Sequence, residues 1–395
     1  MARWIRPLDP TEDDVATFDE ALGGAEVEAT EGGSAYVIDY RYPLDATHGA
    51  LPLRTFFEAP TGHLAMLTAD PRLTDFNPDR ALFLDIETTG LDHGAGTLAF
   101  LIGLGFRDGD DFVVRQLQLR EPSEERAQLS LLQEALDNAD YLVSFNGKSF
   151  DLSVLQTRMV MHRLYTAQES ELKLRPHLDL LHISKNLYRD LWSNTKLQTL
   201  EREALGFVRV DDIPGHLVPA CWYAWMRHAN PEPVAAVALH NLHDMLSMVT
   251  LGIRVVLDSL PVVDGDRLTL VALNLGRLLI RRGRLDQGLR ILQEIPMRLL
   301  LPHECRETLW LQAVVARRQR DDVARRGHLV ALLDHFPDDV PALIDFAIVT
   351  ERAGNFADAL AAAERAQARH RCGKIAKRIT RLTERLARQS SDGCK

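Results

Sequence analysis

Two carboxylates stand two positions apart inside an apolar stretch of the chain. Asp85 and Glu87 follow the apolar run 81–84, and Ile86 separates them. In an extended strand, side chains at positions i and i+2 point to one face, so we expect both acids to project together. Like charges in a buried strand cost free energy unless a cation compensates, and carboxylate oxygens favour Mg²⁺ or Mn²⁺. The alternative is an edge strand with a solvated acidic face, but the apolar run favours burial on both sides.

Two further acids lie on other predicted elements. Asp151 opens a helix directly after Asn146-Gly-Lys-Ser-Phe150, and Asp244 lies in a long helix that begins near Pro231. Four carboxylates can hold two divalent ions roughly 4 Å apart, one to activate a water and one to stabilise the leaving oxygen of an in-line phosphoryl displacement. The set Asp85, Glu87, Asp151 and Asp244 therefore favours phosphodiester hydrolysis.

Other polar residues near these acids are candidates for supporting roles. His240 lies four residues before Asp244, so the two share a helix face, and His240 is our candidate for deprotonating or orienting the attacking water. The alternative is a packing histidine that bonds a backbone carbonyl. We expect Asp179 to make a structural hydrogen bond rather than act as a further acid. The candidate substrate-binding residues are Thr88, Asn146, Lys148 and Ser149, although Lys148 and Ser149 could simply cap a helix. Aromatic residues that could stack bases, but whose spacing is more typical of a core, are Trp222, Tyr223 and Trp225.

The elements that must position these residues predict an α/β fold. Strands come first and then alternate with helices, which is typical of a mixed sheet with helices on its faces. We expect residues 21–33 to be loop and Ser123 to cap the first long helix. The predicted elements in order are strand 34–42, a strand within 51–67, strands 81–88, 98–106 and 112–119, helix 123–138, strand 141–145, a helix from 151, strand 176–181, helix 197–205 and helix 234–257.

Beyond residue 261 the pattern is helical only. Gly283-Arg-Leu285 and Gly354-Asn-Phe356 are 71 residues apart, which two steps of about 34 to 37 residues would cover. A period near 34 with small-residue turns is typical of tetratricopeptide repeats, so we predict three repeats in 262–372. A basic amphipathic helix and tail, 373–395, follows and could cap the stack.

Three motifs together resemble a known superfamily. Asp85-Ile-Glu87-Thr-Thr-Gly-Leu, Asn146-Gly-Lys-Ser-Phe-Asp151 and His240-Asn-Leu-His-Asp244 look like the exonuclease motifs of the DEDD superfamily, on a ribonuclease H-like fold. Gly94-Ala-Gly-Thr97, 177–181 and 211–215 further resemble the YprB-type ribonuclease H-like family of bacterial proteins.

This resemblance covers roughly residues 30–258. It implies a metal-dependent 3′-5′ exonuclease on DNA or RNA, in a family defined more by fold than by established activity. The superfamily has a Tyr four positions, or a His five positions, before the last Asp. Here Leu239 is at minus five and His240 occupies the tyrosine position.

The composition limits the class of protein. The first ten residues have no apolar signal segment and no run approaches the roughly 20 apolar residues of a membrane span, so we expect a cytoplasmic protein without a membrane partner. The four cysteines lack a C-x-x-C pair, which indicates neither a disulfide framework nor a zinc site. The net charge of -10 divides into 22 basic against 38 acidic residues in 1–257 and 24 against 18 in 258–395. The basic half could help to capture a polyanion, or its arginines could simply be solvated.

The sequence therefore predicts an N-terminal extension (1–77), a ribonuclease H-like exonuclease domain (78–258), tetratricopeptide-like repeats (262–372) and a basic C-terminal segment (373–395). We expect hydrolysis of DNA or RNA at a single-stranded 3′ end with two Mg²⁺ or Mn²⁺ ions. The alternative is a catalytically weak or inactive scaffold that binds nucleic acid and recruits a protein partner through its repeats.

Overall fold

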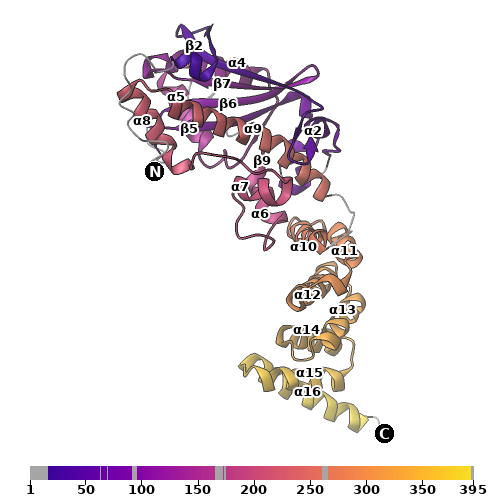
Figure 1. The fold of residues 1–395 in the computed structure, drawn as a ribbon. Coiled ribbons are helices and arrows are strands. Elements are labelled where there is room, and N and C mark those ends of the chain that lie inside the picture. The colour runs from indigo at the N-terminus through magenta and orange to yellow at the C-terminus, as the bar shows by residue number, and fades with distance from the viewer. Residues whose placement is uncertain are drawn as a thin grey trace. The chain divides into compact units, whose positions relative to one another are not determined.

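The structure, a computed structural model, describes residues 17–62, 64–68, 70–90, 96–164, 172, 175–259 and 266–392. The chain forms two compact units, Met1–Leu260 and Pro261–Lys395. The first unit combines a sheet with helices and the second is helical in its described part (Figure 1).

The centre of the first unit is an antiparallel meander of three strands. β5 (Ala81–Thr88) pairs with β6 (Ala99–Asp108), and β6 pairs with β7 (Asp111–Gln118) across a tight turn at Gly109. The turn needs a residue that accepts positive φ, and Gly109 has φ 62°. The structure confirms the three antiparallel strands that the sequence predicts.

Four more strands extend this meander into a seven-stranded mixed sheet. The order is β1-β2-β7-β6-β5-β8-β9. On one side β2 (Ser34–Pro43) and the edge strand β1 (Ala25–Glu28) add antiparallel pairs. On the other side β8 (Tyr141–Ser144) and β9 (His177–Asp179) add parallel pairs. The N-terminal segment 1–77 thus contributes strands to the same sheet as 78–258.

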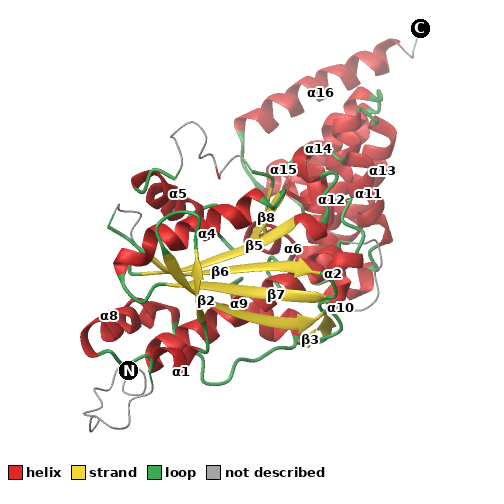
Figure 2. Cartoon of the chain, turned by 90° about the horizontal axis from the view of Figure 1, so that it is seen from above, coloured by secondary structure: helices red, strands yellow, loops and turns green. Residues whose placement is uncertain are grey.

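Helices cover both faces of the sheet (Figure 2). Leu84 and Ile86 of β5 point into a core with α4 (Glu125–Asp137) and α5 (Asp151–Met161). The opposite face packs against α9 (Glu232–Asp258) and α8 (Val218–His228). Among the described helices, α9 is the one whose length and composition would allow it to cross a membrane, and 67% of its most apolar window is buried inside the protein.

The N-terminal region differs from the prediction in two places. Residues 21–33, predicted as loop, contain the end of α1 (Phe18–Leu22) and the strand β1. The predicted strand within 51–67 is mostly helix, because α2 (Arg54–Glu58) and α3 (Leu64–Thr68) follow the two-residue pairing of β3 (Thr47–His48) with β4 (Leu51–Pro52). The buried residues of this stretch, such as Phe56 and Leu64, match helical packing as well as they match a strand.

The remaining elements of the first unit surround the carboxyl end of β5. They are α6 (Leu180–Leu187), α7 (Leu197–Leu200) and a π-helical turn (Glu201–Leu205) that ends at Gly206 with φ 68°. The start of α6 truncates the predicted strand 176–181 to three residues. Ser123 does not cap α4: it lies inside a short 3₁₀ turn, Pro122–Glu124, where its hydroxyl contacts Glu121.

The second unit consists, in its described part, of three helical hairpins and a final helix. The hairpins are α10 (Asp266–Arg281) with α11 (Leu285–Glu294), α12 (Pro302–Gln319) with α13 (Asp322–His335), and α14 (Val340–Arg352) with α15 (Phe356–Arg369). α16 (Gly373–Asp392) packs on α15. In the first hairpin Gly276 and Gly288 allow close approach, since a Cβ on Gly288 would lie 3.1 Å from the carbonyl oxygen of Gly276.

Candidate metal centre

The facing surfaces of β5 and α9 meet through a buried amide. Asn241 of α9 donates its Nδ2 to Asp85 Oδ2 at 2.8 Å, and its Oδ1 accepts from Gln116 Nε2 of β7 at 2.9 Å. Gly103 of β6 lies opposite Asp85, and a Cβ there would stand 2.3 Å from Asn241 Oδ1. The glycine thus lets α9 lie close enough to the sheet for its polar residues to reach the β5 carboxylates.

Three of the predicted site residues converge between these two elements. One ligand atom from each of Glu87, His240 and Asp244 lies within 4.8 Å of the other two. His240 Nε2 is 3.5 Å from Asp244 Oδ2, as expected for helix residues four apart. Carboxylate oxygens with one imidazole suit Mn²⁺ and, through the carboxylates, Mg²⁺, so this donor set fits the divalent cation that the sequence predicts.

Burial and mutual repulsion raise the pKa values of three carboxylates in and around this cluster. Burial, and then the charges of Asp244 and Asp151, raise the pKa of Asp85 well above its usual value. Burial and the charge of Asp85 raise the pKa of Glu87 in the same way. Burial, and then the charge of Asp179, raise the pKa of Asp151 to about 7. The raised pKa values of these three acids are typical of a site whose negative charges a bound cation would compensate.

The loop that leads to Asp151 is held by Asp179. The Asp179 carboxylate accepts from the backbone N–H groups of Asn146 at 3.0 Å, Lys148 at 3.2 Å and Leu181 at 3.1 Å. Asn146 adopts φ 74°, a left-handed conformation that asparagine tolerates better than most residues. Asp179 therefore has the structural role that the sequence favours for it, and it fixes the chain three to five residues before Asp151.

A buried ionic network, which no sequence motif indicates, holds His240 and Asp244 in place. Arg209 donates Nη2 to Asp244 and to Glu201 Oε1, the latter at 2.5 Å, and its side chain is only 4% exposed. Asp212 accepts a hydrogen bond at 2.7 Å from His240 Nδ1. Burial lowers the pKa of His240, but the bond to Asp212 and the charge of Asp244 outweigh it, so the net shift is upward.

An open cleft of about 800 Å³ gives access to this centre. Asp85, His240 and Asp244 lie on its wall, together with Asn146. The other predicted substrate-binding residues lie elsewhere: Thr88 donates its hydroxyl to the Gly90 carbonyl at 2.7 Å. Lys148 and Ser149 do not line the cleft, and burial lowers the pKa of Lys148.

Some of the remaining candidate residues pack in the core, and others lie outside the described residues. Trp222 stacks on Phe100 with ring centroids 5.2 Å apart, and Trp225 donates its indole N–H to the Arg120 carbonyl. Both tryptophans are therefore packing residues and not base-stacking residues, whereas Tyr223 is half exposed. Of the motif 94–97, residues 94 and 95 lie outside the described residues, as do 1–16, 261–265 and 393–395.

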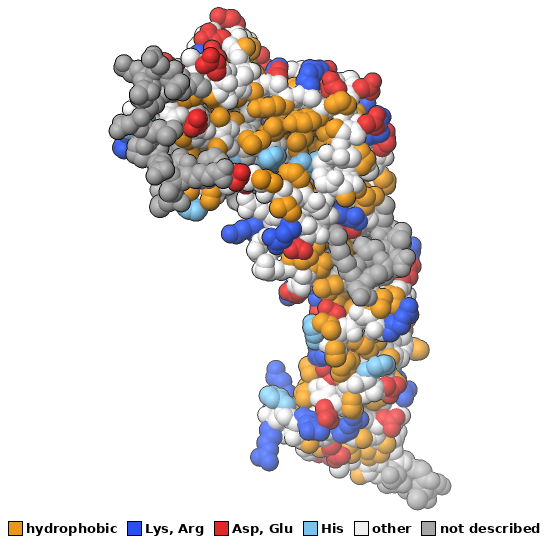
Figure 3. Space-filling model, in the orientation of Figure 1, with side chains coloured by type: hydrophobic (Ala, Val, Ile, Leu, Met, Phe, Trp, Pro, Cys, Tyr) orange, Lys and Arg blue, Asp and Glu red, His pale blue; other side chains and the backbone are white. Residues whose placement is uncertain are grey.

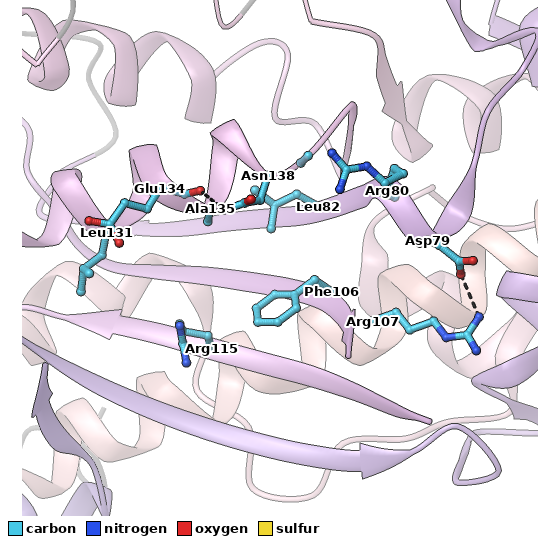
Figure 4. A pocket seen from close by; sticks show the side chains of 12 residues that line it. Asp79, Arg80, Leu82, Phe106, Arg107, Arg115, Leu131, Glu134, Ala135 and Asn138 are labelled. Atoms are coloured by element: carbon cyan, nitrogen blue, oxygen red, sulfur yellow. Dashed lines mark hydrogen bonds and ion pairs between the residues drawn. The ribbon is translucent and has the colours of Figure 1, made fainter. Parts of the chain in front are cut away.

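A second pocket of about 420 Å³ opens on the face of the sheet that carries α4 (Figure 4). Its apolar floor includes Leu82 and Phe106. Its arginines are paired with carboxylates, Arg107 with Asp79 at 2.8 Å and Arg115 with Asp39 at 2.7 Å. With these charges compensated, the pocket offers little to an anionic ligand.

A mixed sheet between helices, with clustered acids where β5 meets α9, defines a ribonuclease H-like fold. Comparison with known proteins agrees: residues 82–256 match the family model of the RNase_H superfamily. The chain is also 32% identical over 219 residues to the uncharacterized protein YprB of Bacillus subtilis (strain 168). That alignment covers 55% of this chain and 52% of YprB, so the chain spans about half the length of this curated relative. These two matches support an RNase H-like family for the first unit.

A solved structure matches with lower similarity. The family B DNA polymerase from the hyperthermophilic archaeon Pyrobaculum calidifontis aligns at 15% identity and a TM-score of 0.37, over 64% of this chain and 34% of the polymerase. The family model covers residues 82–256 and so does not test the second unit, whose tetratricopeptide-like character stays a prediction.

Proposed function

We propose that the chain is a metal-dependent 3′-5′ exonuclease that hydrolyses phosphodiester bonds of DNA or RNA. The observation that carries this proposal is the convergence of Glu87, His240 and Asp244 at an open cleft whose wall also holds Asp85. The RNase H-like family of the domain supports nucleic acid as the substrate.

The residues divide the chemistry between them. Asp85, Glu87, Asp151 and Asp244 would hold two Mg²⁺ or Mn²⁺ ions, which supply an activated water and stabilise charge on the leaving oxygen. Asn241 keeps the Asp85 carboxylate turned toward α9. His240, fixed through Nδ1 by Asp212, presents its Nε2 beside Asp244, where it can orient the attacking water or accept its proton.

The test is cleavage of 3′-labelled and 5′-labelled single-stranded DNA and RNA with Mg²⁺, Mn²⁺ or chelator. Asp85→Asn and Asp244→Asn should each lower the rate at least 100-fold, because each removes a metal ligand. Asp140→Asn is the matched control: its carboxylate pairs with Arg80 on the surface, so its rate should be unchanged. Cleavage that survives both site variants would refute the proposed centre.

One observation favours a second candidate, a scaffold that binds nucleic acid without cutting it. Arg209 already supplies a positive charge to Asp244. If this pairing weakens metal binding, the protein would bind the strand but cleave slowly or not at all. Binding retained without cleavage under Mg²⁺ and Mn²⁺ would favour the scaffold.

For the second unit we propose tetratricopeptide-like repeats that recruit a protein partner. The support is its three helical hairpins in series, closed by α16. Repeats of this kind bury their apolar faces against neighbouring repeats and present an extended surface.

A further inference from the structure

The lysines of the first unit fall within one stretch of the sequence. Residues 1–260 contain four lysines, and all four fall between positions 148 and 196. The unit otherwise uses arginine, and most described arginines pair with carboxylates, as Arg41, Arg80, Arg115 and Arg158 do. These arginines thus neutralise acids of the fold, which leaves cleft-lining lysines as candidates for contact with an anionic ligand.

Two of these lysines stand at the cleft itself. Lys185 of α6 and Lys196, the residue before α7, line it together with Asp85, His240 and Asp244. Both side chains are exposed, and within the described ranges neither ammonium has a carboxylate within 4 Å. Figure 3 shows basic side chains over the region of α6 and α7.

The charge pattern of the cleft suits a strand with a phosphate backbone. The acidic centre, in a unit with excess negative charge, repels a polyanion except where cations compensate. Lysine ammonium groups bind phosphate as flexible point charges and need no fixed geometry. The same wall includes Phe145 and Pro214, whose apolar surface suits sugars and unpaired bases.

We propose that Lys185 and Lys196 bind backbone phosphates of single-stranded nucleic acid and so guide its 3′ end to the carboxylates. This inference rests on the proposed function for the identity of the ligand. In this arrangement Lys185 and Lys196 hold the substrate, the role for which Thr88, Asn146, Lys148 and Ser149 are the candidates from sequence.

The test measures the affinity of the full chain for fluorescein-labelled oligothymidylate and oligouridylate. Fluorescence anisotropy is recorded over a salt series, once with Ca²⁺ and once with chelator. Each phosphate contact to a single strand contributes about 0.7 to the slope of log K against log salt, or about 5-fold in affinity at 0.1 M salt. Lys185→Ala/Lys196→Ala should therefore lower the slope by about 1.4 and weaken binding about 25-fold.

The matched control is Lys374→Ala/Lys377→Ala, which removes two exposed lysines of α16 in the second unit. Its slope should stay within about 0.3 of the unmodified protein. An unchanged slope for the cleft pair, or a loss confined to the α16 pair, would overturn the inference. A greater loss with oligouridylate than with oligothymidylate, or the reverse, would support the inference and identify the preferred strand.

These outcomes are independent of catalysis. If no metal supports cleavage but the cleft pair still loses affinity, the exonuclease proposal fails and the binding site stands. If the enzyme cleaves but the cleft pair binds and cleaves normally, the binding site fails and the exonuclease stands. In an active enzyme the cleft pair should raise KM and leave kcat within about twofold, because the lysines contact the strand away from the reacting bond.

Discussion

Gly103 is the position where the smallest side-chain change should disturb the candidate centre most. It lies on β6 opposite Asp85 and beneath Asn241, which is fully buried. In Gly103→Ala the added Cβ would stand 2.3 Å from Asn241 Oδ1 and 2.9 Å from its Nδ2. Ordinary contact begins near 3.4 Å, so the amide, or α9 with it, must move by about 1 Å.

The expected loss of stability follows from this displacement. Overpacking in a core costs about 1–3 kcal/mol. A shift of about 1 Å also breaks the bonds from Gln116 to Asn241 and from Asn241 to Asp85, at about 1 kcal/mol each. The free energy of unfolding of the first unit should fall by about 3–5 kcal/mol. Because Asp85 loses its orienting donor, metal affinity should fall as well.

The assay is urea unfolding of Gly103→Ala, Asn241→Ala and the double variant, with Gly62→Ala as control. A Cβ on Gly62 meets nothing within 4 Å, so this control should change stability little. In the Asn241→Ala background the clash is gone, and Gly103→Ala should cost less than about 1 kcal/mol. Equal costs of Gly103→Ala in both backgrounds would refute the reasoning.

Three further predictions concern buried ionisable groups. Arg209→Met should lower the free energy of unfolding by about 3–5 kcal/mol, because Asp244 loses its buried cation; a loss below about 1 kcal/mol in urea unfolding contradicts this. Burial, and then nearby positive charge, lower the pKa of His48 from 6.5 to about 4. Between these two pH values the unfolded state binds the proton and the folded state does not. The free energy of unfolding should therefore fall by about 3 kcal/mol as the pH drops from 6.5 to 4. His48→Gln should therefore cost less at pH 4 than at pH 7, and a cost independent of pH would exclude this. In the second unit, Arg325→Met should cost about 3–5 kcal/mol, and Arg325→Met/Asp345→Leu much less, when thermal or urea unfolding is compared; equal losses in both variants would argue against a coupled pair.

Local pattern in the sequence is sufficient to predict the meander and the place of the acids. Alternating and apolar runs predict β5 to β7, and the four-residue spacing of His240 and Asp244 predicts that they share a helix face. These features depend on residues that are close together in the chain, so the local pattern of the sequence is enough to predict them.

Features that depend on distant pairing were not predictable in the same way. The strand at 34–42 alternates clearly, but its partner β7 lies some 75 residues further on, and no local signal names it. β1 has four exposed side chains and therefore no apolar pattern. Arg209 and Asp212 reach the centre only through folding of the 201–212 segment against α9, and charged residues in such a segment look like an ordinary surface loop.

The sheet ends differently at its two edges. β9 is three residues long and fully buried, so its outer backbone groups are covered. β1 is short and exposed, and it carries Glu26, which pairs with Arg120, and Glu28, which accepts from the Ser34 hydroxyl. A strand from another molecule that added to this edge would have to approach two carboxylates over only four residues. The charged edge therefore disfavours aggregation by strand addition.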